Sequence, residues 1–237
     1  MVFANRAEAG RQLADRLAGY TNLEDVIVLG LPHGGVPVAF EIAIRLHVPL
    51  DVFLSRKLGV PAHEELAFGA VAAGDGRFLD EALIEAAGIS SEQVERITLA
   101  TREKLEFWAR LYRYGRPPLH LAGKVIILVD DGIATGASIY AAIHALRQMS
   151  PKKLVIAVPV APISTCNRLR FVADELIVLY APKDFYALGQ FYGRFSQISD
   201  EEVVTLLTEA EESLATQISA RDCAAVHPFR HDEPIQR

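Results

Sequence analysis

Short apolar runs recur along the chain and alternate with longer segments of mixed polarity. Each run is rich in Val, Ile or Leu and has few polar interruptions. The runs are Val26–Leu31, Val52–Leu54, Leu66–Ala72, Val125–Val129, Leu154–Val160 and Leu176–Tyr180. Uniformly apolar runs of this length are typical of strands buried on both faces. We therefore predict an α/β fold with a mainly parallel central sheet flanked by helices.

The intervals between these runs have helical patterns. Three of them begin with a polar residue followed three positions later by Glu or Gln, which is a helix-start signal: Asn5–Gly19, Ser90–Tyr114 and Ser199–Ser213. Two more helices are expected directly after apolar runs, at Gly35–Leu46 and Gly136–Met149.

The length of 237 residues fits one large domain. We assign 1–220 to this domain and read 75–118 as a helical insertion, because that stretch breaks the alternation of strands and helices. The remaining 221–237 is polar with two prolines and is predicted to be a disordered tail.

Composition narrows the class of protein. The net charge of −6 argues against a protein built to neutralise nucleic acid. The two cysteines, Cys166 and Cys223, lie far apart and match no metal-binding spacing or disulfide framework. No run approaches the roughly 18 apolar residues of a membrane span, and no secretory leader is visible. We expect a soluble cytoplasmic protein.

The most informative segment runs from Lys124 to Ile139, where an apolar strand ends in Asp130 and Asp131 and a small-residue turn leads into a helix. Ligands of open α/β sheets bind at the carboxyl ends of strands, and a helix N-terminus attracts phosphate. Adjacent carboxylates need hydroxyl groups or a cation to offset their repulsion. The pattern is neither a Walker A loop nor a dinucleotide-binding glycine motif. A plain strand–turn–helix with Asp131 as a turn residue is the alternative.

The segment Val129–Ser138 resembles the signature with which type I phosphoribosyltransferases bind 5-phosphoribosyl-1-pyrophosphate (PRPP). The resemblance implies that Asp130 and Asp131 are catalytic residues that hold the ribose hydroxyls. It also implies that the loop binds the 5-phosphate through Ala134, Thr135, Gly136, Ala137 and Ser138. The hypoxanthine and guanine enzymes carry an Asp at the position of Ala134, so this chain departs from their pattern.

Other segments extend the resemblance over most of 1–205, toward a bacterial group of predicted phosphoribosyltransferases. The turn Pro32-His33-Gly34-Gly35 resembles the pyrophosphate loop, although many relatives have Arg in place of His33. Arg56 and Lys57 follow an apolar run and are further candidates for pyrophosphate contacts. A solvated basic pair is the alternative there. Gly59–Glu65 would begin a mobile loop that closes over the substrate.

Two aromatic residues after the last apolar run, Phe185 and Tyr186, correspond to the place where related enzymes stack on the nucleobase. The alternative is a packed aromatic loop. The residues that choose the acceptor are expected in the stretch 75–118, which is the least regular part of the chain. The identity of the acceptor therefore stays open.

The resemblance implies transfer of the phosphoribosyl group from PRPP to a nitrogen nucleophile, such as a nucleobase, with release of pyrophosphate. It also implies that the cofactor Mg²⁺ is held by PRPP, aided by Asp130 and Asp131, with no dedicated protein ligand. The expected partners are PRPP and a small-molecule acceptor, without membrane or nucleic acid, and the family commonly forms homodimers. Two rivals stay open: a PRPP-sensing regulator with little catalysis, and a domain acting on another phosphorylated sugar.

Overall fold

The computed structural model describes residues 2–61, 63–72, 76–134 and 136–226. Its centre is a sheet of five parallel strands in the order β2-β1-β6-β7-β8. The strands are β1 (Val26–Gly30), β2 (Leu50–Val52), β6 (Val125–Val129), β7 (Lys153–Val160) and β8 (Glu175–Tyr180). The predicted α/β fold with a parallel central sheet is confirmed.

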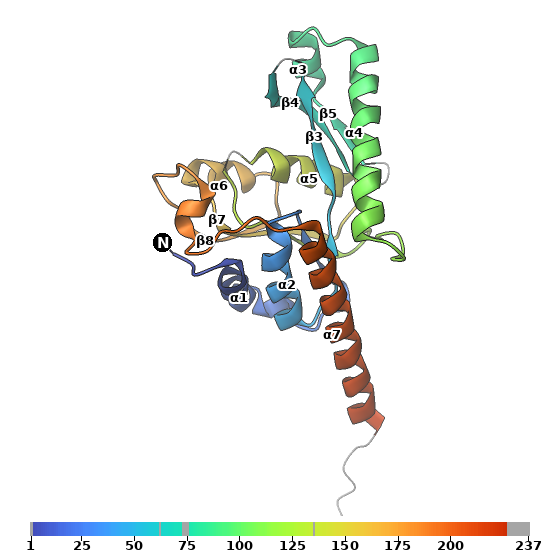
Figure 1. Ribbon diagram of the computed structural model, residues 1–237, viewed down its shortest axis with the longest axis vertical. Coiled ribbons are helices and arrows are strands. Elements are labelled where there is room, and N and C mark those ends of the chain that lie inside the picture. The colour runs from blue at the N-terminus through green and yellow to red at the C-terminus, as the bar shows by residue number, and fades with distance from the viewer. Residues whose placement is uncertain (1, 62, 73–75, 135, 227–237) are drawn as a thin grey trace, which may run out of the picture.

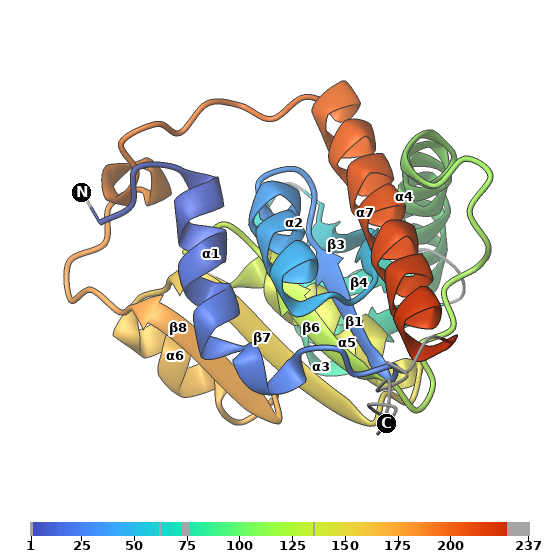
Figure 2. The ribbon, with the colours of Figure 1, turned by 90° about the horizontal axis from the view of Figure 1, so that it is seen from below.

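Helices cover both faces of this sheet (Figures 1 and 2). On one face lie α1 (Arg6–Arg16), α2 (Gly35–Leu46) and α7 (Asp200–Val226), and on the other lie α5 (Ala137–Gln148) and α6 (Ile163–Leu169). Alternate residues of one strand enter different cores: Ile127 packs toward α1 and α2, whereas Ile126 and Leu128 pack toward α5 and α6. This two-sided burial explains why the strand sequences lack polar alternation.

A second unit stands above the central sheet in Figure 1 and is here called the hood, residues 55–112. It contains an antiparallel sheet in the order β3-β4-β5, with α3 and α4. Its elements are β3 (Ser55–Val60), β4 (His63–Ala72), β5 (Arg77–Leu79), α3 (Glu81–Ala86) and α4 (Ser91–Tyr112).

The hood differs from what the sequence predicts. The apolar run from residue 66 to 72 lies in β4, in the antiparallel sheet, not in the parallel one. The inserted unit therefore starts near Ser55, about twenty residues before the predicted boundary, and contains strands as well as helices. The expected mobile loop at 59–65 falls mostly within the paired strands β3 and β4. An apolar run reports burial but not strand direction, so it could not distinguish the two sheets.

The helix starts follow local capping chemistry. The Asn5 side chain accepts a hydrogen bond from the amide of Glu8 at 2.9 Å, and Ser90 forms a complete capping box with Gln93. Ser199 Oγ likewise accepts from the amide of Glu202 at 3.2 Å.

The last helix is longer than its sequence pattern predicts. It ends at Val226, so the first six residues of the predicted tail are helical, and 227–237 lie outside the described residues. Two short 3₁₀ helices, η1 (Ala18–Tyr20) and η2 (Leu188–Phe191), complete the described elements. None of the helices in the described part of the chain has a stretch long and apolar enough to cross a membrane.

Candidate functional site

Two loops meet at the carboxyl edge of the central sheet because their strands are parallel neighbours. Gly30 at the end of β1 pairs in register with Val129 at the end of β6. The amide of Leu31 then donates to the Val129 carbonyl at 2.9 Å, which keeps the two chains together beyond the strands. Residues 31–35 and 130–134 are therefore side by side, as ligand loops of open α/β sheets are.

A small cavity of about 140 Å³ lies at the loop after β6. It is lined by one acidic residue and by the loop that leads into α5: Asp130, Gly132, Ile133, Ala134, Gly136, Ser138 and Ile139. Gly136 has φ of +88°, a left-handed conformation that a residue without Cβ adopts at little cost. The helix begins at the next residue, so its unpaired N–H groups belong to the same wall. The cavity is chemically suited to an anion, with a carboxylate at one end for hydroxyl groups.

Asp131 does not line this cavity and is almost completely buried, with 8% of the residue exposed. Its Oδ2 accepts a hydrogen bond from Nε of Arg6 at 2.8 Å, and its carbonyl accepts one from the Tyr192 hydroxyl at 2.6 Å. Gly34 lies directly against the carboxylate, because an added Cβ at Gly34 would overlap the Asp131 oxygens. The two aspartates thus have different surroundings.

The electrostatics of the pair follow from burial. Desolvation raises the pKa of Asp130 well above its ordinary value, and the neighbouring Asp131 charge raises it further. Desolvation also raises the pKa of Asp131, although the hydrogen bond from Arg6 acts in the opposite direction. A pair of adjacent, largely desolvated carboxyl groups with raised pKa values is typical of a functional site.

The side chain of His33, in the loop after β1, contacts residues of two other elements. Its Nε2 lies 2.9 Å from Oδ1 of Asp200 and 3.0 Å from the hydroxyl of Tyr112. Tyr112 also donates to Asp200, and Trp108 meets the His33 ring edge-on at 5.8 Å. The loop that contains the predicted pyrophosphate residues is therefore linked through its side chain to α4 of the hood and to the start of α7.

The 193–199 segment, here called the strap, crosses the carboxyl edge between η2 and α7 and passes the first turns of α1 and α2 (Figure 2). Arg6 binds the strap, because its Nη1 donates a hydrogen bond to the Ser196 carbonyl at 2.7 Å. The guanidinium also lies 4.0 Å from the centre of the Phe195 ring. Phe195 in turn stacks on Tyr192, with ring centres 5.0 Å apart.

The other predicted site residues are distributed unevenly. Thr135 lies outside the described residues. Arg56 and Lys57 are neighbours in β3, so their side chains leave opposite faces of the strand. Phe185 packs on Phe191 at 5.3 Å, whereas Tyr186 is 86% exposed, and neither lines the cavity at the β6 loop. Pro32, Gly34 and Gly35 do lie in the loop beside Asp131, together with His33.

Across the residues that the structure describes, no group of three or more His, Cys, Asp or Glu could hold a metal ion by itself. Carboxylate oxygens are nonetheless suitable ligands for Mg²⁺ when a substrate supplies the rest of the coordination shell. Asp130, which lines the cavity, has a carboxylate of this kind, whereas Oδ2 of Asp131 is already bound by Arg6.

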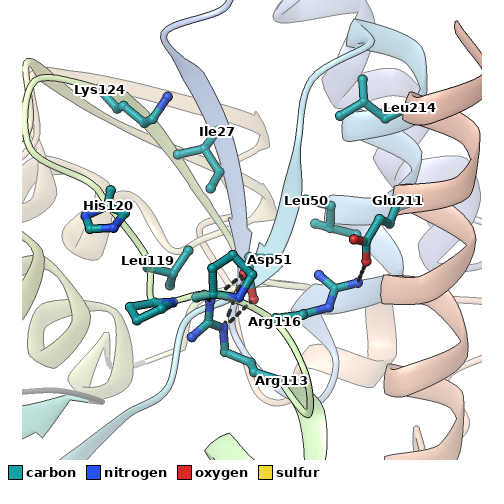
Figure 3. A pocket seen from close by; sticks show the side chains of 13 residues that line it. Ile27, Leu50, Asp51, Arg113, Arg116, Leu119, His120, Lys124, Glu211 and Leu214 are labelled. Carbon is teal, nitrogen blue, oxygen red and sulfur yellow. Dashed lines mark hydrogen bonds and ion pairs between the residues drawn. The ribbon is translucent and has the colours of Figure 1, made fainter. Parts of the chain in front are cut away.

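A larger cavity of about 280 Å³ lies away from this edge, beside β2 and α7 (Figure 3). Its arginines are already paired: Arg113 contacts Asp51 through two nitrogens, and Arg116 contacts Glu211 at 2.8 Å. The cations in this wall hold the end of α4 to β2 and α7, which is a structural role.

Two residues of the site, Tyr192 and Asp200, have no motif that marks them in sequence. Arg6 lies 125 positions before Asp131 along the chain. It belongs to the Asn-Arg-x-Glu-Ala-Gly pattern of residues 5–10, which is part of the resemblance to the bacterial phosphoribosyltransferase group. That pattern places Arg6 at the first turn of α1 but gives no indication of what the turn faces.

Comparison with known proteins agrees with this geometry. The family model described as "Phosphoribosyl transferase domain" matches residues 3–187. Two curated proteins of Mycobacterium tuberculosis, from strains CDC 1551 and H37Rv, are 43% identical over 235 residues, and both are named "Putative phosphoribosyl transferase". That match covers 99% of this chain but 52% of each relative, so the chain spans about half their length.

A solved structure extends the comparison to three dimensions. The protein TT1426 from Thermus thermophilus is 42% identical, with a TM-score of 0.80. The match covers 88% of this chain and 99% of that one. The loop after β6, the pyrophosphate-type loop after β1 and the parallel sheet that joins them all lie within the residues that the family model matches. The chain belongs to the phosphoribosyl transferase domain family.

Proposed function

We propose that this protein transfers the 5-phosphoribosyl group from PRPP to a nitrogen nucleophile, a nucleobase or related heterocycle, and releases pyrophosphate. The observation that carries the proposal is the cavity at the start of α5, which is lined by Asp130, by residues 132–134 and by the helix start at Gly136 and Ser138. A phosphorylated sugar has hydroxyl groups for the carboxylate and a phosphate for the turn, so this arrangement favours such a ligand.

In the reaction, C1 of the ribose gains one bond and loses another. The nitrogen of the acceptor forms a bond to C1 of the ribose, the bond from C1 to the pyrophosphate oxygen breaks, and pyrophosphate leaves with that electron pair. The acceptor nitrogen then loses its proton. Asp130 orients the ribose and places negative charge near the positive charge that develops at C1.

Charge on the leaving group needs its own partners. The amide of Gly34 and the cation of Arg56 or Lys57 are the candidates for the pyrophosphate, because the amide of Gly35 already donates to the Leu31 carbonyl at 3.0 Å. Mg²⁺ carried by PRPP would neutralise charge on the pyrophosphate, with Asp130 and Asp131 as the carboxylates that assist it. Of the proposed base contacts, the exposed ring of Tyr186 is free to stack on an acceptor, whereas Phe185 already packs on Phe191.

The test is turnover with defined partners. The protein is incubated with PRPP, MgCl₂ and a panel of purine and pyrimidine bases, and pyrophosphate release is measured for each base. We expect release with at least one base, and its loss in the double variant Asp130→Asn with Asp131→Asn when circular dichroism shows that the variant is folded. Unchanged turnover in that variant would remove Asp130 and Asp131 from the mechanism.

A PRPP-sensing regulator is the second candidate, and one observation favours it. His33, which replaces the Arg of many relatives, is paired with Asp200 and Tyr112, so the loop lacks a side chain free to hold the leaving group. Calorimetric binding of PRPP with MgCl₂, without pyrophosphate release for any base, would support the sensor. Thermal shifts with other sugar phosphates but not with PRPP would instead support action on a different phosphorylated sugar.

A further inference from the structure

Asp131 is the point where four separate segments of the chain meet. Arg6 comes from α1, Gly34 from the loop after β1, Tyr192 from the segment after η2, and Asp131 from the loop after β6. The side chains of Arg6 and Asp131 are 10% and 11% exposed. A carboxylate this deeply buried needs its cation and its hydrogen bonds, because an unpaired charge there would be strongly unfavourable.

These contacts form a closed ring. Arg6 holds the carboxylate of Asp131 and lies over Phe195, Phe195 stacks on Tyr192, and Tyr192 donates to the main-chain carbonyl of Asp131. The side chain and the backbone of Asp131 are thus fixed by connected groups. A second bond from Arg6 to Ser196 ties the strap into the same ring.

Asp130 is placed differently. It lines the cavity of the phosphate-type turn, is partly exposed, and its Oδ1 accepts a hydrogen bond from the amide of Asp131 at 2.9 Å. Two adjacent acidic residues therefore divide into one that faces the cavity and one whose oxygen is already bound by Arg6.

We propose that Arg6 is a positioning residue for the sugar-phosphate site: by holding Asp131 against Gly34 and Tyr192, it sets the shape of the 31–35 loop and leaves Asp130 to contact the ribose. This inference rests on the proposed function. It assigns a role to a residue of α1 that touches neither the cavity nor the turn. Arg6 acts through Asp131, so its effect should vanish when Asp131 can no longer accept its bond.

The experiment measures affinity for PRPP with MgCl₂ by calorimetry in four variants and in the reference variant Asp131→Asn. Arg6→Gln keeps a polar side chain but removes the charge, Arg6→Lys keeps the charge, and Arg11→Gln is the control on the same helix. Arg11 pairs with Glu41 at 3.1 Å at an exposed position, so its loss should not reach the site. The fourth variant combines Arg6→Gln with Asp131→Asn and is compared with Asp131→Asn alone.

We expect at least tenfold weaker binding in Arg6→Gln, partial recovery in Arg6→Lys, and wild-type affinity in Arg11→Gln. In the Asp131→Asn background, Arg6→Gln should have little further effect. Wild-type affinity in folded Arg6→Gln, or effects of Arg6→Gln and Asp131→Asn that simply add, would overturn the inference.

A readout without ligand keeps this inference separate from the proposed function. If the wild-type protein gives no heat with PRPP, the proposed function fails, and the role of Arg6 is judged by hydrogen exchange in the peptide that covers 31–36. The amide of Gly35 donates to the Leu31 carbonyl at 3.0 Å and reports on the loop. Faster exchange in Arg6→Gln than in Arg11→Gln supports the positioning role, and equal exchange overturns it. If Arg6→Gln does not fold, the same comparison is made with Arg6→Lys, which loses the bond to Ser196 but keeps the charge.

Discussion

Nε2 of His33 lies 3.0 Å from the hydroxyl of Tyr112, and this contact joins the loop after β1 to helix α4 of the hood. Asp200 bonds to both residues and adds the start of α7 to the junction. A shift of α4 would therefore pull directly on the 31–35 loop. The hood and the sugar-phosphate site are mechanically connected through three side chains.

Replacing Tyr112 by Phe should weaken this junction without emptying the space that its ring fills. Tyr112 is 3% exposed, and its hydroxyl bond is the main reason why the pKa of Asp200 lies below the ordinary value. We expect a loss of about 1–2 kcal/mol in the free energy of unfolding, as for a partly buried hydrogen bond to a charged group. Urea denaturation measures it. Tyr114→Phe, at a residue that is 91% exposed, should change nothing, and an equal loss there would contradict the assignment.

Asp130→Asn should stabilise the protein while it abolishes turnover. The pKa of Asp130 is raised in the folded state, first by burial and then by Asp131, so the folded protein binds this proton more tightly than the unfolded chain does. Wild-type stability therefore falls as the pH rises from the ordinary Asp range through the raised pKa. The variant lacks this loss and should be more stable at pH 8 by about 1–2 kcal/mol.

The advantage of Asp130→Asn should shrink as the pH falls toward 4. Urea unfolding at pH 8, 6 and 4.5 measures this trend, with Asp184→Asn at an exposed position as the control. An advantage that grows on acidification would show that the charge of Asp130 is not the destabilising group.

Gly34→Ala should disrupt the site although it adds one methyl group. The new Cβ would overlap the carboxylate of Asp131, which cannot move without breaking its bond to Arg6. Overpacking of this kind costs about 1–3 kcal/mol, and the displaced loop should lose PRPP affinity as well. Gly19→Ala is the matched control, because a Cβ at Gly19 meets no atom within 4 Å. Calorimetry with PRPP measures the affinity of both variants, and thermal denaturation measures their stability.

The ion pair of Arg113 and Asp51 should be important for stability rather than for ligand binding. Nε of Arg113 lies 3.0 Å from Oδ1 of Asp51, and the two side chains are 15% and 9% exposed (Figure 3). Arg113→Met leaves a buried carboxylate without its cation, which costs about 3–5 kcal/mol. Adding Asp51→Asn should restore part of that loss in urea unfolding. A loss no larger than that of Arg11→Met, at an exposed pair, would mean that Asp51 is solvated after Arg113 is removed.

Local chemistry explains what the sequence could predict. The caps of Asn5, Ser90 and Ser199 are bonds between residues three apart, so a short pattern contains all their information. The strand that ends at Val129 is equally local, because uniform apolar character follows directly from burial on both faces. The turn after it was recognisable for the same reason, since one segment supplies the carboxylate, the glycine and the helix start.

What the sequence could not predict depends on long-range contacts. Arg6 and Asp131 are adjacent in space through the packing of α1 on the sheet, and no spacing along the chain encodes that. The two aspartates look equivalent in sequence, yet only Asp130 lines the cavity. The placement of β4 in a separate antiparallel sheet has a similar origin, because pairing with β3 and β5 decides it, and its own residues do not.

The hood leaves the central sheet after β2 and returns before β6, and β1 lies between those two strands. The chain therefore leaves the sheet at its carboxyl edge, where β2 ends, and returns to its amino edge, where β6 begins. Recombination could exchange the hood between related chains. The ligand that the hood contacts could then change, while the residues proposed to bind the sugar phosphate stayed the same.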